Sequence, residues 1–487
     1  MSAKKTGAHK IGADKPVKDT LDPADWIKTR AEAHRMLDDM LDHIRQIRDK
    51  PVWQPMPQET REAFHAPLPR GPEALANIHA EFLSSILPYG SGNTHPRFMG
   101  WVQGAGTVPG MLAEMLAAGL NANLGGRDHG GIAVERQVVE WVRALFGFPE
   151  SASGLFVTGT SMANFLAVLI ARAKALGANV RRSGVGGSTL RGYTSTAVHG
   201  CVRRAFDYAG LGSDALEEID TDAAHRIDIG KLKARIASDR AAGLYPFMVI
   251  ASAGTVDVGA IDDLKALAAL CAEEQLWFHV DGAFGALGIL APDIAPRLKG
   301  IEHADSIAFD FHKWGQVPYD AGFLLVRDGK LHMDTFAAPA AYLRRDTRGL
   351  SAGSPWPCDF GPDLSRGFRA LKTWFTLKAF GTEKLGEMIS QACAVARHLE
   401  ARVRSEVELE LVSGAGLNIV CFRYRGDDLL NSEIVADMQE AGIAAPSLTT
   451  LDGRVAIRAC IINHRTGFED VDALVDAALM FGRRRGS

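Results

Sequence analysis

Residues 305–320 hold the most reactive combination of side chains in the chain. β-branched and aromatic residues predict a buried strand over 306–311, which runs directly into His312 and Lys313. A lysine at the end of a buried strand is unfavourable unless its charge is paired or its amine is engaged. Such an amine can attack a carbonyl and form a Schiff base.

A second strand end supplies a partner for that lysine. The run Leu-Trp-Phe-His-Val at 276–280 ends at Asp281, 32 residues before Lys313. Pyridoxal phosphate needs such a pair, because the lysine holds its aldehyde and the aspartate keeps its pyridine nitrogen protonated, so that the ring accepts electrons. The two strand ends therefore predict pyridoxal 5'-phosphate as cofactor.

Two more strand ends could complete such a site. Thr160 and Ser161 follow a predicted strand at 154–157 and open a predicted helix at 161–176, where N–H groups and hydroxyls suit a phosphate. An ordinary glycine turn with a hydroxyl N-cap is the alternative, and no Walker A lysine follows. His199 ends another strand and offers a flat ring for stacking, although an isolated histidine is more often structural.

Each of these residues also has a plain explanation. Asp281 could be a helix N-cap, His312 and Lys313 a surface dipeptide, and the small residues around Thr255 a simple turn. Taken together they lie at the carboxyl ends of predicted strands, the edge where open α/β sheets bind their ligands. The combination favours a shared site over separate structural roles.

The elements that position these residues alternate along the chain. Strands are predicted at 154–157, 193–197, 247–251, 277–280, 306–311 and 322–326, with helices between them, which indicates a mostly parallel sheet covered on both faces. We expect a helical N-terminal segment at 1–105, with residues 1–20 disordered, a large cofactor-binding domain at 106–383 and a small α+β domain at 384–487. The N-terminal helices should pack on the main body or on a partner subunit.

Composition narrows the class of protein. The 487 residues are 47% hydrophobic and 23% charged, which is typical of a soluble globular protein. The formal net charge of −4 gives no reason to expect nucleic acid or membrane as partner. Six scattered cysteines without metal spacing favour a reducing compartment over a disulfide framework or a zinc site. With no apolar leader in the sequence, we expect a cytoplasmic protein.

These motifs together resemble the group II pyridoxal-phosphate decarboxylases, which include the aromatic-L-amino-acid, histidine and glutamate decarboxylases. The resemblance covers about residues 53–468. It is strongest in His-Val-Asp-Gly-Ala at 279–283 and His-Lys-Trp at 312–314, with support from His-Pro-Arg-Phe at 95–98 and Asn-Ala-Asn at 121–123. It implies an α/β fold of the aspartate-aminotransferase type (fold type I), with a seven-stranded central sheet and a homodimer whose active sites lie at the interface.

The resemblance also implies a role for each site residue. Lys313 would hold the cofactor aldehyde and Asp281 the pyridine nitrogen, with His199 stacked on the ring and Ala283 packed beneath it. The phosphate would lie against Thr160, Ser161 and Thr255, with His312 nearby. Arg458 would meet the substrate carboxylate, and Phe98 and Trp101 would line the substrate pocket.

Two positions depart from the family pattern. The loop tyrosine credited with protonating the substrate's α-carbon is expected near Trp356 and Pro357, and Tyr342 lies further upstream. Loss of that tyrosine is associated with oxidative aldehyde synthases. Many relatives also have asparagine where this chain has Asp310, and because a carboxylate repels a phosphate, we expect Asp310 to face elsewhere.

A few aromatic residues near the expected pocket indicate the class of substrate. Phe98, Trp101 and Trp356 favour an aromatic or bulky apolar L-amino acid, whereas a glutamate-type substrate would call for a further cation such as Arg97 or Arg127. Decarboxylation to the amine and CO₂ is the leading hypothesis. The alternatives are an aldehyde synthase, another lyase or an aminotransferase on the same scaffold, and a non-catalytic cofactor-binding protein.

Overall fold

The computed structural model describes residues 20–338 and 345–486. Most of the segment predicted to be disordered, residues 1–19, and Tyr342 lie outside this description. The described chain divides into two compact units, one formed by residues 20–50 and 55–90 and the other by residues 51–54 and 91–486. The predicted domain boundaries stay a prediction.

The smaller unit is helical. Its first helix begins after Asp25, whose carboxylate accepts hydrogen bonds from the N–H groups of Ile27 and Lys28, both at 3.0 Å. Inside the unit, Glu32 lies 3.0 Å from a ring nitrogen of His79, and both side chains are buried. The main elements are α1 (Trp26–Arg45), α2 (Gln58–Ala63), α3 (Leu75–Glu81) and a π-helical turn η2 (Phe82–Ile86).

The larger unit is built on a seven-stranded sheet with the order β2-β8-β7-β6-β5-β3-β4. Only β8 runs antiparallel to its neighbours, so the sheet is mostly parallel, as predicted. The short strand β4 was not predicted, because Glu217 and Glu218 interrupt its apolar residues. The strands are β2 (Ser153–Val157), β3 (Leu190–Ser195), β4 (Leu216–Ile219), β5 (Tyr245–Ser252), β6 (Trp277–Asp281), β7 (Ser306–Asp310) and β8 (Gly322–Val326).

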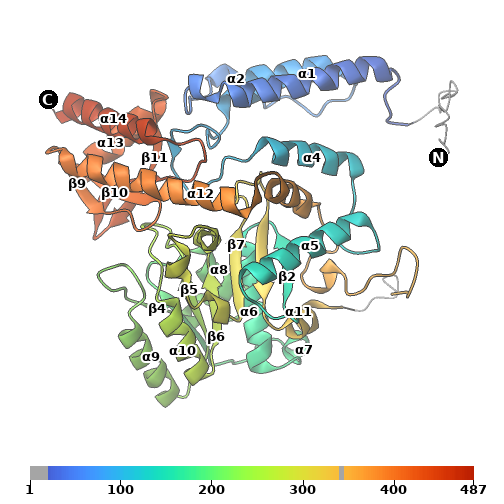
Figure 1. The fold of residues 1–487 in the computed structure, drawn as a ribbon, viewed down its shortest axis with the longest axis vertical. Helices are drawn as coiled ribbons and strands as arrows, with labels where there is room; N and C mark the ends of the chain where they lie inside the picture. Colours follow the sequence, from blue (N-terminus) through green and yellow to red (C-terminus); the bar gives the residue numbers. More distant parts are fainter. Residues whose placement is uncertain (1–19, 339–344, 487) are drawn as a thin grey trace, which may run out of the picture. The chain divides into compact units, whose positions relative to one another are not determined.

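Helices cover both faces of this sheet (Figure 1). Alternate residues of β6 point to opposite faces, so that Trp277 packs in the cluster with α6 and α8, whereas Phe278 and Val280 pack with α5 and α10. Both faces are apolar, as expected for a parallel sheet buried between helix layers. The covering helices are α5 (Gly130–Leu145), α6 (Thr160–Leu176), α8 (Cys201–Tyr208), α9 (Ile229–Ala241), α10 (Leu264–Glu274) and α11 (Gly329–Phe336).

A second sheet forms near the C-terminus, with the order β1-β11-β12-β10-β9. Helix α12 (Arg369–Ser405) contacts α4 and α5 with its first half and α14, β9 and β10 with its second, and a break at Gly381, with φ of 71°, separates the halves. The remaining elements are α4 (Val108–Leu120), β1 (Phe98–Met99), β9 (Leu409–Ser413), β10 (Ile419–Tyr424), α13 (Asp428–Glu440), β11 (Ala445–Leu451), β12 (Arg454–Cys460) and α14 (Phe468–Gly486).

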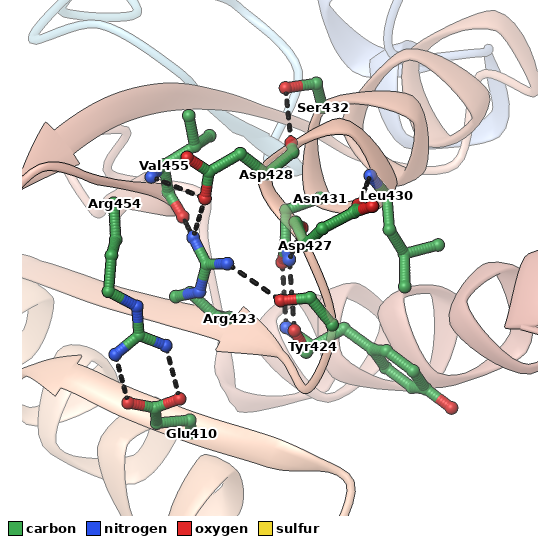
Figure 2. Close-up of polar contacts among 11 residues, drawn as sticks. Glu410, Arg423, Tyr424, Asp427, Asp428, Leu430, Asn431, Ser432, Arg454 and Val455 are labelled. Atoms are coloured by element: carbon green, nitrogen blue, oxygen red, sulfur yellow. Dashed lines mark hydrogen bonds and ion pairs between the residues drawn. The ribbon is translucent and has the colours of Figure 1, made fainter.

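A buried arginine fixes the edge of this second sheet (Figure 2). Arg423 is 2% exposed and lies 2.7 Å from the carboxylate of Asp428, which also accepts the N–H of Val455 at 3.1 Å. A two-bond pair between Arg454 of β12 and Glu410 of β9, at 2.8 and 2.7 Å, joins these two strands across β10, which lies between them. These contacts hold the start of α13 against β12.

A buried ion pair fixes the approach to β2. Arg366 donates to the carboxylate of Glu135 at 2.7 and 3.2 Å, and its remaining N–H groups reach the carbonyls of Leu124 and Phe156 at 2.8 Å each. Losing either partner would leave a buried charge uncompensated, which typically costs about 3–5 kcal/mol. The pair therefore anchors the strand that leads into Thr160. No described helix is long and apolar enough to cross a membrane.

Candidate active site

A cavity of about 410 Å³ opens at the carboxyl ends of the parallel strands. Its volume is in the range of small-molecule sites. It brings together every predicted site residue except Phe98 and Trp356. These are Trp101, Thr160, Ser161, His199, Thr255, Asp281, Ala283, His312, Lys313 and Arg458.

The N-terminus of α6 has the features of a phosphate-binding site, called here the phosphate cradle. Thr160 begins the helix, and its hydroxyl oxygen is buried with no hydrogen-bond partner in the described chain. Gly322 allows the backbone to come close here, because a Cβ at that position would lie 2.3 Å from the Cα of Gly159. An unpartnered buried hydroxyl beside the N–H groups of a helix start fits a bound phosphate. Ser161 and Thr255 line the same cavity.

Asp281 lies at the end of β6 and is 6% exposed. Its carboxylate accepts hydrogen bonds from Asn164 Nδ2 at 2.9 Å and from the N–H of Ala283 at 3.2 Å. Burial raises the pKa of the carboxyl, while the Asn164 bond and the charge of Lys313 act in the opposite direction. The two N–H donors fit a carboxylate that holds a protonated pyridine nitrogen.

The expectation that Asp310 faces away from the site is wrong. Asp310 is 3% exposed, lines the cavity, and accepts the N–H of Thr160 at 2.7 Å. Its second oxygen lies 3.2 Å from Lys313 Nζ. The prediction weighed only the phosphate charge, whereas the lysine cation and the positive end of α6 also act on this carboxylate. Both neighbours attract it into the site.

Burial favours the neutral form of the two cavity histidines. Burial lowers the pKa of His312, whose Nδ1 accepts the N–H of Ala321 at 3.0 Å. Partial burial also lowers the pKa of His199, although its ring is exposed at the opening, and Nδ1 accepts the N–H of Cys201 at 3.2 Å. Asp281 opposes the shift of His199. A flat neutral ring at the opening is suited to stacking on a cofactor ring.

Arg458 reaches the cavity from β12, but backbone carbonyls already engage its guanidinium. Nε and Nη2 donate to the carbonyl of Val256 at 3.1 and 2.6 Å, and Nη1 donates to the carbonyl of Gly100 at 2.8 Å and to the hydroxyl of Ser447 at 3.2 Å. Most of the guanidinium is therefore engaged within the protein. The predicted role of Arg458 at the substrate carboxylate stays a prediction.

Two aromatic residues do not lie where the sequence placed them. Phe98 is 2% exposed and pairs in β1 with Ala445, so its ring is buried in a small cluster rather than on the cavity. Trp356 is fully buried and bonds the carbonyl of Ala352, between the guanidinium groups of Arg127 and Arg345. Only Trp101, 61% exposed, remains at the cavity mouth.

Two further polar residues contribute to the site without having been predicted. Asn164 lies one turn after Thr160 on α6, and this four-residue spacing places both on the face toward the sheet. Tyr319 lines the cavity with its ring 4.3 Å from that of His312, and burial raises the pKa of its hydroxyl. The helical spacing could have revealed Asn164, whereas Tyr319 lies in an irregular segment without a periodic pattern.

Comparison with known proteins identifies a family for this chain. Residues 57–425 match the family model described as the pyridoxal-dependent decarboxylase conserved domain. The chain belongs to this family. The cofactor is therefore pyridoxal phosphate, as the paired Asp281 and Lys313 predicted, and the protein is a carboxy-lyase, as the resemblance implied.

Individual relatives agree with this assignment. The chain is 34% identical to an aromatic-L-amino-acid decarboxylase of Bacillus atrophaeus, over 91% of this chain and 93% of the relative. It is 33% identical to an L-2,4-diaminobutyrate decarboxylase of Rhizobium meliloti, over 84% and 83%. A glutamate decarboxylase domain from Vibrio parahaemolyticus superimposes with a TM-score of 0.82 at 25% identity, over 96% and 97%. The predicted fold is confirmed.

The position of Asp310 predicts how tightly the cofactor binds. Asp310→Asn keeps an oxygen for the N–H of Thr160 but removes a negative charge from the phosphate cradle and releases Lys313 from its ion pair. Both effects favour the cofactor, so we expect the Kd for pyridoxal phosphate to fall about tenfold, equivalent to about 1.4 kcal/mol. Absorbance titration of cofactor-free protein measures it.

Pyridoxal without its phosphate is the matched control ligand. If phosphate repulsion dominates, Asp310→Asn should leave the Kd for pyridoxal nearly unchanged, whereas release of Lys313 would tighten both ligands equally. Weaker binding of pyridoxal phosphate to the variant would show that Asp310 assists the cofactor.

Proposed function

We propose that this enzyme decarboxylates an aromatic or bulky apolar L-amino acid to its amine and CO₂. The observation that carries the proposal is that Lys313 and Asp281 face one cavity whose exposed wall is the indole of Trp101. The aromatic-L-amino-acid decarboxylase relative supports the same substrate class.

Bound pyridoxal phosphate supplies an aldehyde for the substrate amine and a protonated ring that takes up the electron pair left by CO₂. Thr160 and Ser161 would hold the phosphate, and Asp281 would hold the proton on the ring nitrogen. A fixed carboxylate placed where electrons arrive stabilises the transition state without reorganisation. His199 would cover one face of the ring and exclude water.

Lys313 would hold the cofactor through its aldehyde and would give up this place to the substrate amine. Asp310, 3.2 Å from Nζ, gives the free amine a fixed place as an ammonium ion. The ion pair thereby keeps the lysine at the cavity.

The charges around the cavity argue against an acidic side chain on the substrate. Arg97, named as a possible partner for a glutamate-type substrate, lies 3.4 Å from Asp470 and does not line the cavity. Arg127 lies over the ring of Trp356, 4.5 Å from its centroid. Among the described residues, the cations on the lining are Lys313 and Arg458, and both already have partners.

Aldehyde formation is the second candidate function. The observation that favours it is Trp356, which occupies the neighbourhood expected for the loop tyrosine and is fully buried. If the enzyme is instead a decarboxylase, the proton for the α-carbon would have to come from another group on the cavity lining. Tyr319 is the group we propose, because it lines the cavity and carries a hydroxyl.

We also propose that the enzyme is a homodimer. Within α4, the side chains of Met115, Leu116 and Leu120 are 54%, 49% and 62% exposed, an apolar surface that a second copy of the chain would cover.

Lys313→Ala tests the proposed chemistry. Without the amine, the visible absorbance of lysine-bound cofactor should disappear and kcat for amine formation should fall by about 10³-fold or more. The measurement combines absorbance of the reconstituted protein with mass spectrometry of products from a panel of L-amino acids. Unchanged absorbance and turnover would contradict the role of Lys313.

The same panel separates the two candidate functions for the wild-type enzyme. Amine and CO₂ without oxygen uptake are the result expected for decarboxylation. Oxygen uptake with aldehyde and hydrogen peroxide would instead establish the synthase.

Trp101→Ala tests the substrate class. Aromatic contacts contribute about 0.5–1.5 kcal/mol, so KM for an aromatic substrate should rise roughly tenfold while KM for a small aliphatic amino acid stays within about twofold. Trp26→Ala is the matched control, because this indole is 65% exposed in α1 and does not line the cavity, so its KM values should not change. An equal rise for both substrate types in Trp101→Ala would contradict the proposal.

The dimer is tested by the mass of the protein in solution. Each chain is 52.4 kDa, and light scattering should give about twice that value. Changing Leu116 and Leu120 to serine should shift the mass toward one chain. A wild-type protein of single-chain mass with full activity would contradict the dimer.

A further inference from the structure

A line of buried polar side chains runs behind Asp281, away from the cavity. All four members are at most 3% exposed, and successive atoms lie 2.7–2.9 Å apart. In order, the contacts are Trp277 Nε1 to Ser306 Oγ, Ser306 Oγ to His279 Nδ1, His279 Nε2 to Asn164 Oδ1, and Asn164 Nδ2 to Asp281 Oδ2.

The local structure dictates this arrangement. Trp277, His279 and Asp281 alternate along β6 and therefore share the face toward α6. Ser306 is the Cα partner of His279 in the adjacent strand β7. Asn164 comes from α6, which packs on this face. Two strands and one helix thus contribute to a single polar line within an apolar layer.

The chemistry of the groups gives this line a direction. An indole N–H can only donate, so Ser306 Oγ accepts from Trp277, and its own hydrogen can go to His279 Nδ1. Nδ1 is then the acceptor, and Nε2 carries the ring hydrogen and donates to Asn164 Oδ1. The amide nitrogen of Asn164 faces Asp281 and donates to it. Every hydrogen bond points toward the carboxylate.

The opposite direction requires a different protonation state. If His279 donated to Ser306, Asn164 would turn its oxygen toward Asp281, and two acceptors would meet unless Asp281 were protonated. Ser306 would then accept from both Trp277 and His279, and its own hydrogen would lose its acceptor in this line. The line therefore favours the carboxylate form of Asp281.

His279 takes part as a neutral ring. Its side chain is 0% exposed, and burial lowers its pKa to about 3. The ring therefore carries one N–H hydrogen. It fixes which way the neighbouring hydrogen bonds run but adds no charge to the line. Hydrogen bonds in such a line polarise one another. Removing the hydroxyl of Ser306 should therefore weaken the hydrogen bond that Asn164 donates to Asp281.

We propose that Trp277, Ser306, His279 and Asn164 are positioning residues that keep Asp281 oriented and ionised for the pyridine nitrogen of the cofactor. This inference rests on the role of Asp281 in the proposed function. It assigns part of the cofactor's binding strength to side chains that do not contact it.

The test compares two cofactors in Ser306→Ala. With pyridoxal phosphate, we expect the Kd to rise about tenfold and the acid limit of binding to move to higher pH, because weaker donation raises the pKa of Asp281. With an analogue whose ring nitrogen is replaced by carbon, the Kd should change less than about twofold. Trp277→Phe should raise the Kd for pyridoxal phosphate by a smaller factor and leave the Kd for the analogue nearly unchanged. This second variant keeps the test available if Ser306→Ala folds poorly.

Thr194→Val is the matched control. Thr194 is a fully buried hydroxyl in β3 that bonds the carbonyl of Ile250 and lies outside the line. Its loss should leave the ratio of the two Kd values at the wild-type level.

Equal losses with both cofactors in Ser306→Ala and Trp277→Phe would show a purely structural role and overturn the proposal. Because the readout is binding, a wrong assignment of the reaction would leave this result intact. Failure of wild-type protein to distinguish the two cofactors would instead contradict the role of Asp281 itself.

Discussion

The proposed site depends on keeping the carboxylate of Asp281 charged although it is buried. Burial of Asp281 favours its neutral form, whereas its proposed role at the pyridine nitrogen needs the charged one. The chain resolves this conflict with N–H donors, one from the backbone of Ala283 and one from Asn164. The second donor requires α6 to lie directly against β6. Because α6 also begins with Thr160, the same placement sets the phosphate cradle at a fixed distance from the ring-nitrogen partner.

Much of this could be predicted because local patterns encode it. Apolar strands that end in Asp281 and Lys313 identify the binding edge of the sheet, since parallel strands bring their carboxyl ends together. Contacts set by distant pairings could not be predicted in this way. Phe98 joins a two-residue strand whose partner, Ala445, is more than three hundred residues away, and this pairing buries the ring. The short strand β4 was missed because its two glutamates hide the apolar pattern.

Asp310 shows a different limit of sequence reasoning. Its charge was weighed against one expected neighbour, the phosphate, and was therefore placed elsewhere. In the structure its neighbours are the first N–H of α6 and the amine of Lys313, and each attracts a carboxylate. The orientation of a charged side chain follows from the sum of all nearby charges and dipoles, and that sum is known only once the fold brings them together.

The partners of the charged groups in the cavity also bear on substrate selection. Asp310 engages the amine of Lys313, and carbonyls from two loops and a hydroxyl engage most of the guanidinium of Arg458. A site whose charges are already committed has little to offer a charged substrate side chain, since desolvating such a group without a partner is unfavourable. An apolar ring carries no such penalty and gains contact with Trp101 and Phe284, which line the cavity. The proposed selectivity for an aromatic side chain rests on this use of the site's charges for contacts within the protein.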